Sequence, residues 1–370
     1  MMPQIIKSES KRITELDGIR GIAALLIITW HYGTSQLVNN HSLAAGYFKV
    51  MSTYFWTGVD LFFILSGFLL GNILLKNRSS ENYFKAFYIR RICRIFPIYY
   101  LVLTIVFVIC ILGIGYSTDW WFNDKISYWP YLFYVQNIYI AFTETLGNRW
   151  ISHTWSLGLE EQFYLILPLL IYFLNKKNLV IVLVICVLSA PIFRYFISNW
   201  YQTFNLIYCR FDSLFMGVLI ALAMRSENIV RYFQKNNKQF TYLLLVMIAA
   251  TILFSLKIIH LYYFIANSWF SLLFTILLMV VLTNDKNIFS VISRNSLLVK
   301  TGIISYGMYL YHPVIAGLLH FFVKNQSPQI QNISDLFLTI LSFVITIIVS
   351  HYSFNYFEKK GIQFGHKFNY

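Results

Sequence analysis

Charged residues are scarce in this sequence. Only 12% of its 370 residues are Asp, Glu, Lys or Arg, against about a quarter in soluble domains, and 58% are hydrophobic. The mean hydropathy is +0.61. This balance excludes an ordinary soluble domain and predicts an all-α, polytopic membrane protein.

Cysteines and processing signals are also few. The four cysteines lie in or beside apolar segments and match no metal-site spacing, so we expect neither a metal ion nor a disulfide. The first apolar segment follows a charged stretch without a small-residue cleavage site, so it is expected to stay as a membrane anchor. We find no repeat, no low-complexity segment and no soluble domain. The sequence predicts one integral-membrane domain over 1–370, with cytoplasmic tails at about 1–16 and 357–370.

Ten apolar segments are long enough to cross a bilayer. They cover residues 18–38, 53–75, 94–115, 155–174, 179–198, 206–224, 239–257, 260–283, 299–322 and 334–356. An eleventh segment, 128–142, is shorter and carries Gln136 and Asn137. If it does not cross, most of the 29 Lys and Arg residues lie on one side, whereas a crossing divides them almost evenly. The positive-inside rule therefore favours ten transmembrane helices with both termini in the cytoplasm, and leaves 128–142 as a re-entrant or interfacial piece.

The net charge is strongly positive, at +14. In a soluble protein this would suggest nucleic acid as a partner. In a membrane protein it is explained by cytoplasmic loops that face anionic lipid headgroups. Membrane lipids are therefore expected partners, and nucleic acid is not.

One group of cations lies at the predicted cytoplasmic ends of two helices. Asp17 and Arg20 are three residues apart in the first helix and can pair, while Arg91 and Arg94 share one face of the third. Guanidinium groups near a helix N-terminus suit phosphate oxygens, so these arginines are candidates for a phosphorylated ligand. The alternative is plain topological anchoring. For Arg91 and Arg94 both interpretations stay open on residue type alone.

A second group of titratable residues lies nearer the predicted outer face, on five helices. It comprises His31, Asp60, Glu160 with Glu161, Arg210 with Asp212, and His312. Charges of both signs at one depth indicate a polar cavity, because each would otherwise face lipid at a cost of a few kcal/mol. We expect Arg210 to pair with Asp212 or Glu160 as scaffolding. His31 is then the best candidate for a free base.

Spacing in the first two helices adds detail. Arg20 and His31 are eleven residues apart, which returns nearly to the same helix face about 16 Å along the axis. This favours a ligand bound toward one side of the membrane and chemistry nearer the other. Ser66 could be a nucleophile, but no base lies beside it in the sequence. Gly67 and Gly71 form a small-residue face typical of close helix packing.

Seven segments, in order, resemble the membrane acyltransferase-3 family. They are Leu16-Asp-Gly-Ile-Arg-Gly-Ile-Ala-Ala running on to His31, Gly58-Val-Asp-Leu-Phe-Phe-Ile-Leu-Ser-Gly-Phe68, Arg90-Arg-Ile-Cys-Arg-Ile-Phe-Pro97, Gln136-Asn137, Trp155-Ser-Leu-Gly-Leu-Glu-Glu-Gln-Phe-Tyr164, Arg210-Phe-Asp-Ser-Leu-Phe-Met-Gly217 and Ser305-Tyr-Gly-Met-Tyr-Leu-Tyr-His312. The resemblance implies a ten-helix membrane enzyme that moves acyl groups, often acetyl from acetyl-CoA, onto sugars of surface polysaccharides. By this resemblance, Arg20 and His31 match the family's Arg-x10-His pair, and Arg91 and Arg94 match its Arg-x-x-Arg. Some members carry a C-terminal esterase-like domain, and we expect this chain to be a stand-alone member without one.

Residues and resemblance together predict an O-acetyltransferase of a bacterial cytoplasmic membrane. The donor, acyl-CoA, would be held by Arg20, Arg91 and Arg94. His31 would take the proton from a hydroxyl of a cell-surface carbohydrate or its lipid-linked precursor, or be acylated first. Glu160 or Asp60 would orient its ring or balance the imidazolium. The supporting residues are expected to be Asp17, Ser66, Trp155, Arg210, Asp212 and His312. Two alternatives stay open: a transporter or flippase for a lipid-linked sugar, and a non-catalytic scaffold for polysaccharide assembly.

Overall fold

A computed structural model describes residues 13–38, 42–113, 127–197 and 199–370. Within these ranges the regular structure is helical, apart from one bridge between Leu37 and Ile330. Long apolar segments form helices because a helix satisfies its own backbone hydrogen bonds where lipid offers none. The all-α prediction is confirmed.

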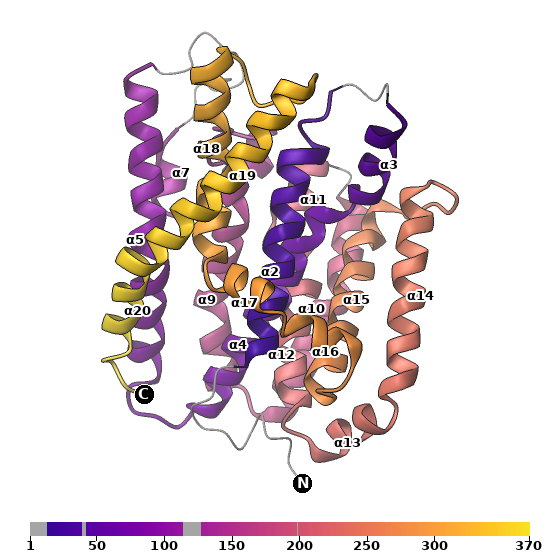
Figure 1. Cartoon of the computed structure of the whole chain (residues 1–370). Coiled ribbons are helices and arrows are strands. Elements are labelled where there is room, and N and C mark those ends of the chain that lie inside the picture. Colours follow the sequence, from indigo (N-terminus) through magenta and orange to yellow (C-terminus); the bar gives the residue numbers. More distant parts are fainter. Residues whose placement is uncertain (1–12, 39–41, 114–126, 198) are drawn as a thin grey trace.

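The described helices form one bundle (Figure 1). The long helices are α2 (Thr14–Thr29), α4 (Gly58–Lys76), α5 (Tyr83–Ile111), α9 (Trp155–Phe173), α10 (Lys176–Phe196), α12 (Phe211–Ala223), α14 (Asn237–Ser255), α15 (Tyr263–Thr283), α18 (Ser305–Lys324) and α19 (Ile333–Ser353). The short ones are α3 (Leu43–Ser52), α7 (Trp129–Leu132), α8 (Gln136–Thr143), α11 (Trp200–Asn205), α13 (Glu227–Lys235), α16 (Ile288–Ser293), α17 (Ser296–Ile303) and α20 (Lys359–Gly365). Single turns of 3₁₀ or π type complete the set: η1 (Trp30–Thr34), η2 (Phe55–Thr57), η3 (Ser152–Thr154), η4 (Ile207–Arg210) and η5 (Phe354–Glu358).

The predicted number of spans is confirmed only in part. Six described stretches are long and apolar enough to cross a membrane, and two helix pairs bent by 101° and 73° raise this to at most eight. The predicted spans 18–38 and 155–174 are helical but do not meet that criterion. The helix of the first, α2, carries Asp17 and Arg20, and α9 carries two adjacent glutamates.

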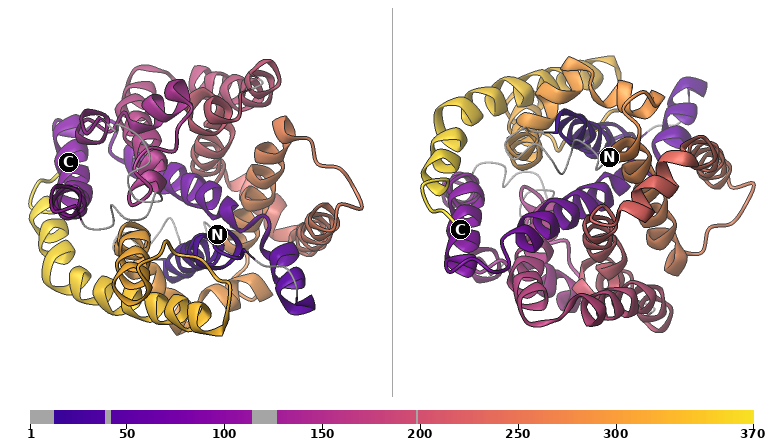
Figure 2. Two further views of the ribbon diagram at one scale, coloured as in Figure 1. Left: turned by 90° about the horizontal axis from the view of Figure 1, so that it is seen from above. Right: turned by 90° about the horizontal axis from the view of Figure 1, so that it is seen from below.

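Two helices form the centre of the bundle. Seen along its length, α2 and α4 lie in the middle and the other helices surround them (Figure 2). The described chain begins with α2 and ends with α20 toward the same end of the bundle, which also carries α13; α3 lies at the opposite end (Figure 1). We call these the α13 end and the α3 end.

The segment 128–142 does not form a spanning helix. It is divided into α7 and α8, of four and eight residues, by a turn in which Tyr134 adopts a positive φ of 56°. Eight helical residues extend only about 12 Å. Gln136 and Asn137 are fully buried and donate to the carbonyls of Thr154 and Asn205. The segment therefore packs against α9 and α11, as expected of a piece that does not cross.

Backbone contact between α4 and α12 depends on two glycines. A Cβ added at Gly67 would lie 2.2 Å from the carbonyl oxygen of Leu214, and one at Gly217 would lie 2.2 Å from that of Ile64. Neither position has room for a side chain, so only glycine allows this close approach. The predicted packing role of the Gly67 and Gly71 face is confirmed, because a Cβ at Gly71 would also lie against α12, 3.3 Å from side-chain atoms of Ala221 and Val218. This contact fixes which residues of α4 and α12 face each other.

Candidate active site

Three arginines from two helices meet at one cavity, which we call the arginine cavity. Its volume is about 110 Å³, and its lining includes Arg20 from α2 with Arg91 and Arg94 from α5. Asp17 lies 3.6 Å from Arg20, as the three-residue spacing predicted. The cavity therefore concentrates positive charge in the α13 half of the bundle.

A chain of hydrogen bonds lies on the wall of the arginine cavity. The hydroxyls of Ser66 and Tyr164 are 2.9 Å apart, and the Tyr164 hydroxyl donates to Glu160 Oε2, also at 2.9 Å. Glu160 thus lies beside the arginine cluster and not against His31, where the sequence interpretation placed it. The sequence interpretation placed Glu160 near the outer end of its helix. In the structure it lies about one and a half turns inside α9, and therefore deeper.

The second cavity is larger and lies toward the α3 end. Its volume is about 630 Å³, and we call it the histidine cavity because His31, His153 and His312 line it. Ile27 and Val59 line both cavities, so the two adjoin. Ile27 lies one helical turn before His31. The imidazole and the arginines therefore face two adjoining spaces at different depths along α2.

The hydrogen bonding of His31 determines which ring nitrogen is basic. His31 lies in η1, a π-helical turn that continues α2, and its Nδ1 is 3.0 Å from the carbonyl oxygen of Ile27. A carbonyl only accepts, so Nδ1 carries the hydrogen of the neutral ring and Nε2 carries the lone pair. Single π turns within helices are frequent at functional sites, and this one sets the ring's direction. His31 thus has the tautomer a general base requires.

Two further histidines lie against His31. The ring centroids of His31 and His312 are 4.9 Å apart, and those of His312 and His153 are 5.0 Å apart. His312 Nδ1 is 2.7 Å from the carbonyl oxygen of Tyr309, so its Nε2, buried and without a partner in the described structure, also carries a lone pair. His312 was expected to be a supporting residue. His153 was missed, because it lies in the turn η3 just outside the predicted apolar span.

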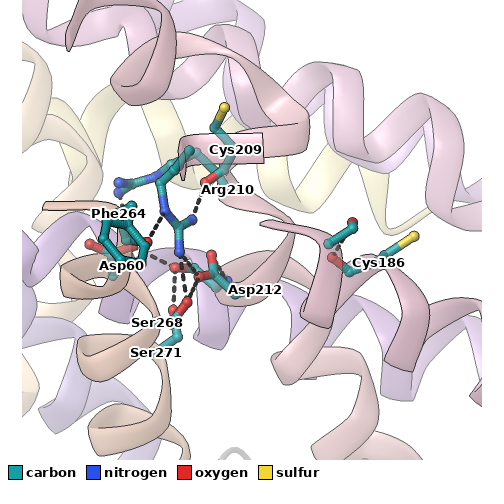
Figure 3. Close-up of polar contacts among 11 residues, drawn as sticks. Asp60, Cys186, Cys209, Arg210, Asp212, Phe264, Ser268 and Ser271 are labelled. Carbon is teal, nitrogen blue, oxygen red and sulfur yellow. Dashed lines mark hydrogen bonds and ion pairs between the residues drawn. The ribbon is translucent and has the colours of Figure 1, made fainter. Parts of the chain in front are cut away.

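Charged residues of α4, α10, α12 and the turn η4 form two buried ion pairs. Arg210 Nη2 is 2.8 Å from Asp60 Oδ1, and Arg194 Nη2 is 2.7 Å from Asp212 Oδ2 (Figure 3). The prediction that Arg210 pairs with Asp212 or Glu160 is therefore wrong. Depth along the membrane could not choose among carboxylates on different helices, whereas the close contact of α4 with α12 brings Asp60 to Arg210.

The contacts of Asp60 indicate a structural role. It is fully buried, and its Oδ1 accepts hydrogen bonds from Arg210 and Ser213. Asp60, Arg210 and Asp212 are absent from the described linings of both cavities. Asp60 therefore does not orient the His31 ring as proposed from sequence. Trp155, expected to be a supporting residue, lines the histidine cavity and lies over the Arg210 guanidinium at 5.8 Å.

Metal binding has no geometric support in this region. Within the described residues, no three His, Cys, Asp or Glu side chains are placed so that they could hold a metal ion. Among them, the three clustered imidazoles contact carbonyls or each other's faces instead.

Comparison with known proteins identifies the family. The sequence model described as an acyltransferase domain, that of the acyltransferase-3 family, matches residues 13–352. This chain belongs to the acyltransferase-3 family. The match spans both cavities, so the arginine and histidine clusters belong to the family domain.

Relatives of this chain include proteins of Staphylococcus aureus and Listeria monocytogenes. A Staphylococcus aureus (strain COL) protein named "Putative O-acetyltransferase" is 26% identical over 95% of this chain. The "Peptidoglycan O-acetyltransferase OatA" of Listeria monocytogenes is 32% identical over 48% of it. The chain spans 58% of the length of the Staphylococcus relative and 27% of that of OatA. No solved structure matches the chain.

Proposed function

We propose that this chain is a membrane O-acetyltransferase that moves an acetyl group from acetyl-CoA to a hydroxyl of a cell-surface carbohydrate. The observation that carries the proposal is the pair of adjoining cavities. One is lined by three arginines, and the other by His31, whose Nε2 carries the lone pair. Family membership and relatives named as O-acetyltransferases support the same reaction class.

The arginine cavity supplies the donor site. Guanidinium groups bind phosphate oxygens through paired, charge-assisted hydrogen bonds, and CoA carries several phosphates. Arg20, Arg91 and Arg94 would hold these phosphates at the α13 end. The thioester would then reach His31, about 16 Å further along α2, past Ile27 and Val59, which line both cavities.

His31 carries out the proton transfers. Its Nε2 takes the proton of the acceptor hydroxyl while that oxygen attacks the thioester carbonyl carbon. The carbon–sulfur bond then breaks, and the leaving thiolate takes a proton from the His31 imidazolium to give CoA. An acyl-His31 intermediate would use the same nitrogen. The hydrogen bond from Nδ1 to Ile27 keeps Nε2 directed at the substrates in either route.

The proposed orientation places the α13 end in the cytoplasm. Acetyl-CoA is a cytoplasmic metabolite. The loop 225–238, which contains α13, carries four Lys and Arg residues, and the positive-inside rule favours the cytoplasm for such a loop. Single cysteines at Lys235, in α13, and at Gln329, in the loop before α19, test this in a variant without the four native cysteines. An impermeant thiol reagent added outside intact cells should label position 329 and spare position 235; the reverse pattern would overturn the orientation.

The function itself is tested on the glycans. Cells that express the chain and cells that lack it are supplied with isotopically labelled acetate, and their surface glycans are compared by mass spectrometry. The proposal predicts glycans that gain labelled acetyl groups only when the chain is present. A transporter or flippase predicts altered glycan amounts without new acetyl groups, and that result would contradict an acetyltransferase.

A further inference from the structure

The histidine cavity carries polar atoms that the proposed proton transfers do not use. Gln36 Oε1, Asn205 Oδ1, Asn267 Nδ2 and both ring nitrogens of His153 are buried and have no hydrogen-bond partner in the described structure. All four residues line this cavity. Buried polar atoms are normally hydrogen-bonded, because leaving one unpaired is costly. Donors and acceptors gathered around one space therefore suit a ligand rich in hydroxyl groups.

Aromatic side chains form much of the remaining wall. Trp56, Trp155 and Trp200 line the cavity around Phe204, whose ring centroid lies 4.6–5.4 Å from theirs. Flat aromatic faces pack against the apolar faces of sugar rings, while a few placed polar groups fix orientation, as in other ligand sites. The wall and the unpaired atoms together fit a saccharide.

One arginine in this wall has no counter-charge. Arg149 lines the cavity, and its guanidinium makes no hydrogen bond or ion pair with any described residue. The other lining arginine, Arg194, is neutralised by Asp212. Among the described residues that line the cavity, none is Asp or Glu. The cavity therefore presents one uncompensated positive charge, from Arg149, beside three imidazoles.

The backbone around Arg149 is firmly anchored. Its neighbours Asn148 and Trp150 are 4% and 0% exposed, and the amide of Trp150 donates to Asn148 Oδ1 at 3.0 Å. The Tyr131 hydroxyl accepts a hydrogen bond from the amide of Asn148 and touches the place where a Cβ of Gly147 would lie, at 2.5 Å. A residue held on both sides directs its side chain reproducibly, as a specificity determinant must.

We infer that Arg149 anchors an anionic group of the acceptor, so that this enzyme acts on an acidic saccharide, one that carries a carboxylate or phosphate. The inference rests on the proposed function, since it specifies the substrate class of the same site. A guanidinium–anion pair in this half-enclosed cavity selects a charged sugar over its neutral analogue.

Direct binding measurements test this inference. The purified protein is placed in nanodiscs of zwitterionic lipid, so that no anionic headgroup competes, and tryptophan fluorescence reports ligand entry past Trp155 and Trp200. The probes are glucuronate, glucose 1-phosphate, neutral glucose and inorganic phosphate. The charged sugars should bind about tenfold or more tightly than glucose, as expected for one charge-assisted pair. Inorganic phosphate alone should bind more weakly than glucose 1-phosphate.

Variants separate Arg149 from general charge. Arg149→Gln should remove the preference for the charged sugars while leaving glucose binding unchanged, and Arg149→Lys should restore part of it. Lys257→Gln changes an exposed cation between α14 and α15, outside the described lining of the cavity, and should keep the full preference. Equal binding of charged and neutral sugars by the native protein, or an unchanged preference in Arg149→Gln, would overturn the inference.

The two proposals fail in different ways. CoA binding should be normal in Arg149→Gln, because the arginine cavity lies elsewhere. If the native protein binds no CoA but still prefers charged sugars, the acetyltransferase proposal fails and the acidic-saccharide site stands. If it binds CoA but shows no such preference, the acidic-saccharide inference alone fails.

Discussion

The buried pair between Asp60 and Arg210 should be a structural support, and the substitution Asp60→Asn tests this. Asn keeps an acceptor oxygen for Ser213 but removes the charge that neutralises Arg210. The Arg210 guanidinium would lose its counter-charge, and its Nε and Nη1 have no hydrogen-bond partner in the described structure. What remains beside it are the rings of Phe63, Trp155 and Phe204, 5.2–5.8 Å from its central carbon.

The expected cost follows from this isolation. Removing one partner of a buried ion pair typically destabilises a protein by about 3–5 kcal/mol, because the other charge is left buried without compensation. Aromatic rings return part of this, about 1–2 kcal/mol. We therefore expect Asp60→Asn to lower the free energy of unfolding by roughly 1–4 kcal/mol. The double variant Asp60→Leu with Arg210→Met should recover most of that loss, because it removes both charges.

Thermal unfolding in detergent, followed by tryptophan fluorescence, measures this effect. Glu227→Gln is the control, because it breaks the exposed pair with Arg231 and should change stability little. Acetyl transfer per folded molecule should persist in Asp60→Asn, since the Asp60 side chain does not line either cavity. A variant that unfolds like the native protein but has lost transfer would refute the reasoning and return Asp60 to the chemistry.

Three further predictions follow from the two cavities and the helix packing. Arg91→Ala or Arg94→Ala should weaken CoA binding about ten- to a hundredfold, measured by calorimetry, whereas Arg231→Ala should not; equal affinities would leave the pair as topology signals. Gly217→Leu should prevent the α4–α12 contact and yield little folded protein by size-exclusion chromatography; a normal yield would show that the helices can separate at no cost. His312→Gln should fold and bind CoA but transfer more slowly, because it removes the imidazole whose ring centroid lies 4.9 Å from that of His31; an unchanged rate would make His312 a packing residue only.

Much of the fold was predictable from sequence, because hydropathy and charge asymmetry act locally. The helices, the Asp17–Arg20 contact and the sharing of one cavity by Arg20, Arg91 and Arg94 follow from periodicity and depth along each helix. The number of membrane crossings was less secure, because α9 carries two glutamates and falls short of the apolarity of a clear span.

The errors concern contacts between helices. Asp60, Asp212 and Glu160 were assigned similar depths, and only the rotation and packing of α4 against α12 determine which one meets Arg210. That packing depends on the close contact at Gly67 and Gly217. The sequence around either glycine does not show which helix it will meet. His153 gave no periodic signal, because it lies in a single 3₁₀ turn. Its one sequence clue was its place two residues before Trp155.

The most direct test of the account is acetyl transfer by His31→Gln. The purified native enzyme and this variant are given radiolabelled acetyl-CoA and a glycan acceptor extracted from the producing cells, with His260→Gln, an exposed histidine, as the matched control. We expect a rate lower by about 10²–10⁴-fold for His31→Gln, with normal CoA affinity and a normal melting temperature, and a native rate for the control. Full transfer by a well-folded His31→Gln enzyme would contradict the account, because the base between the two cavities would then be dispensable.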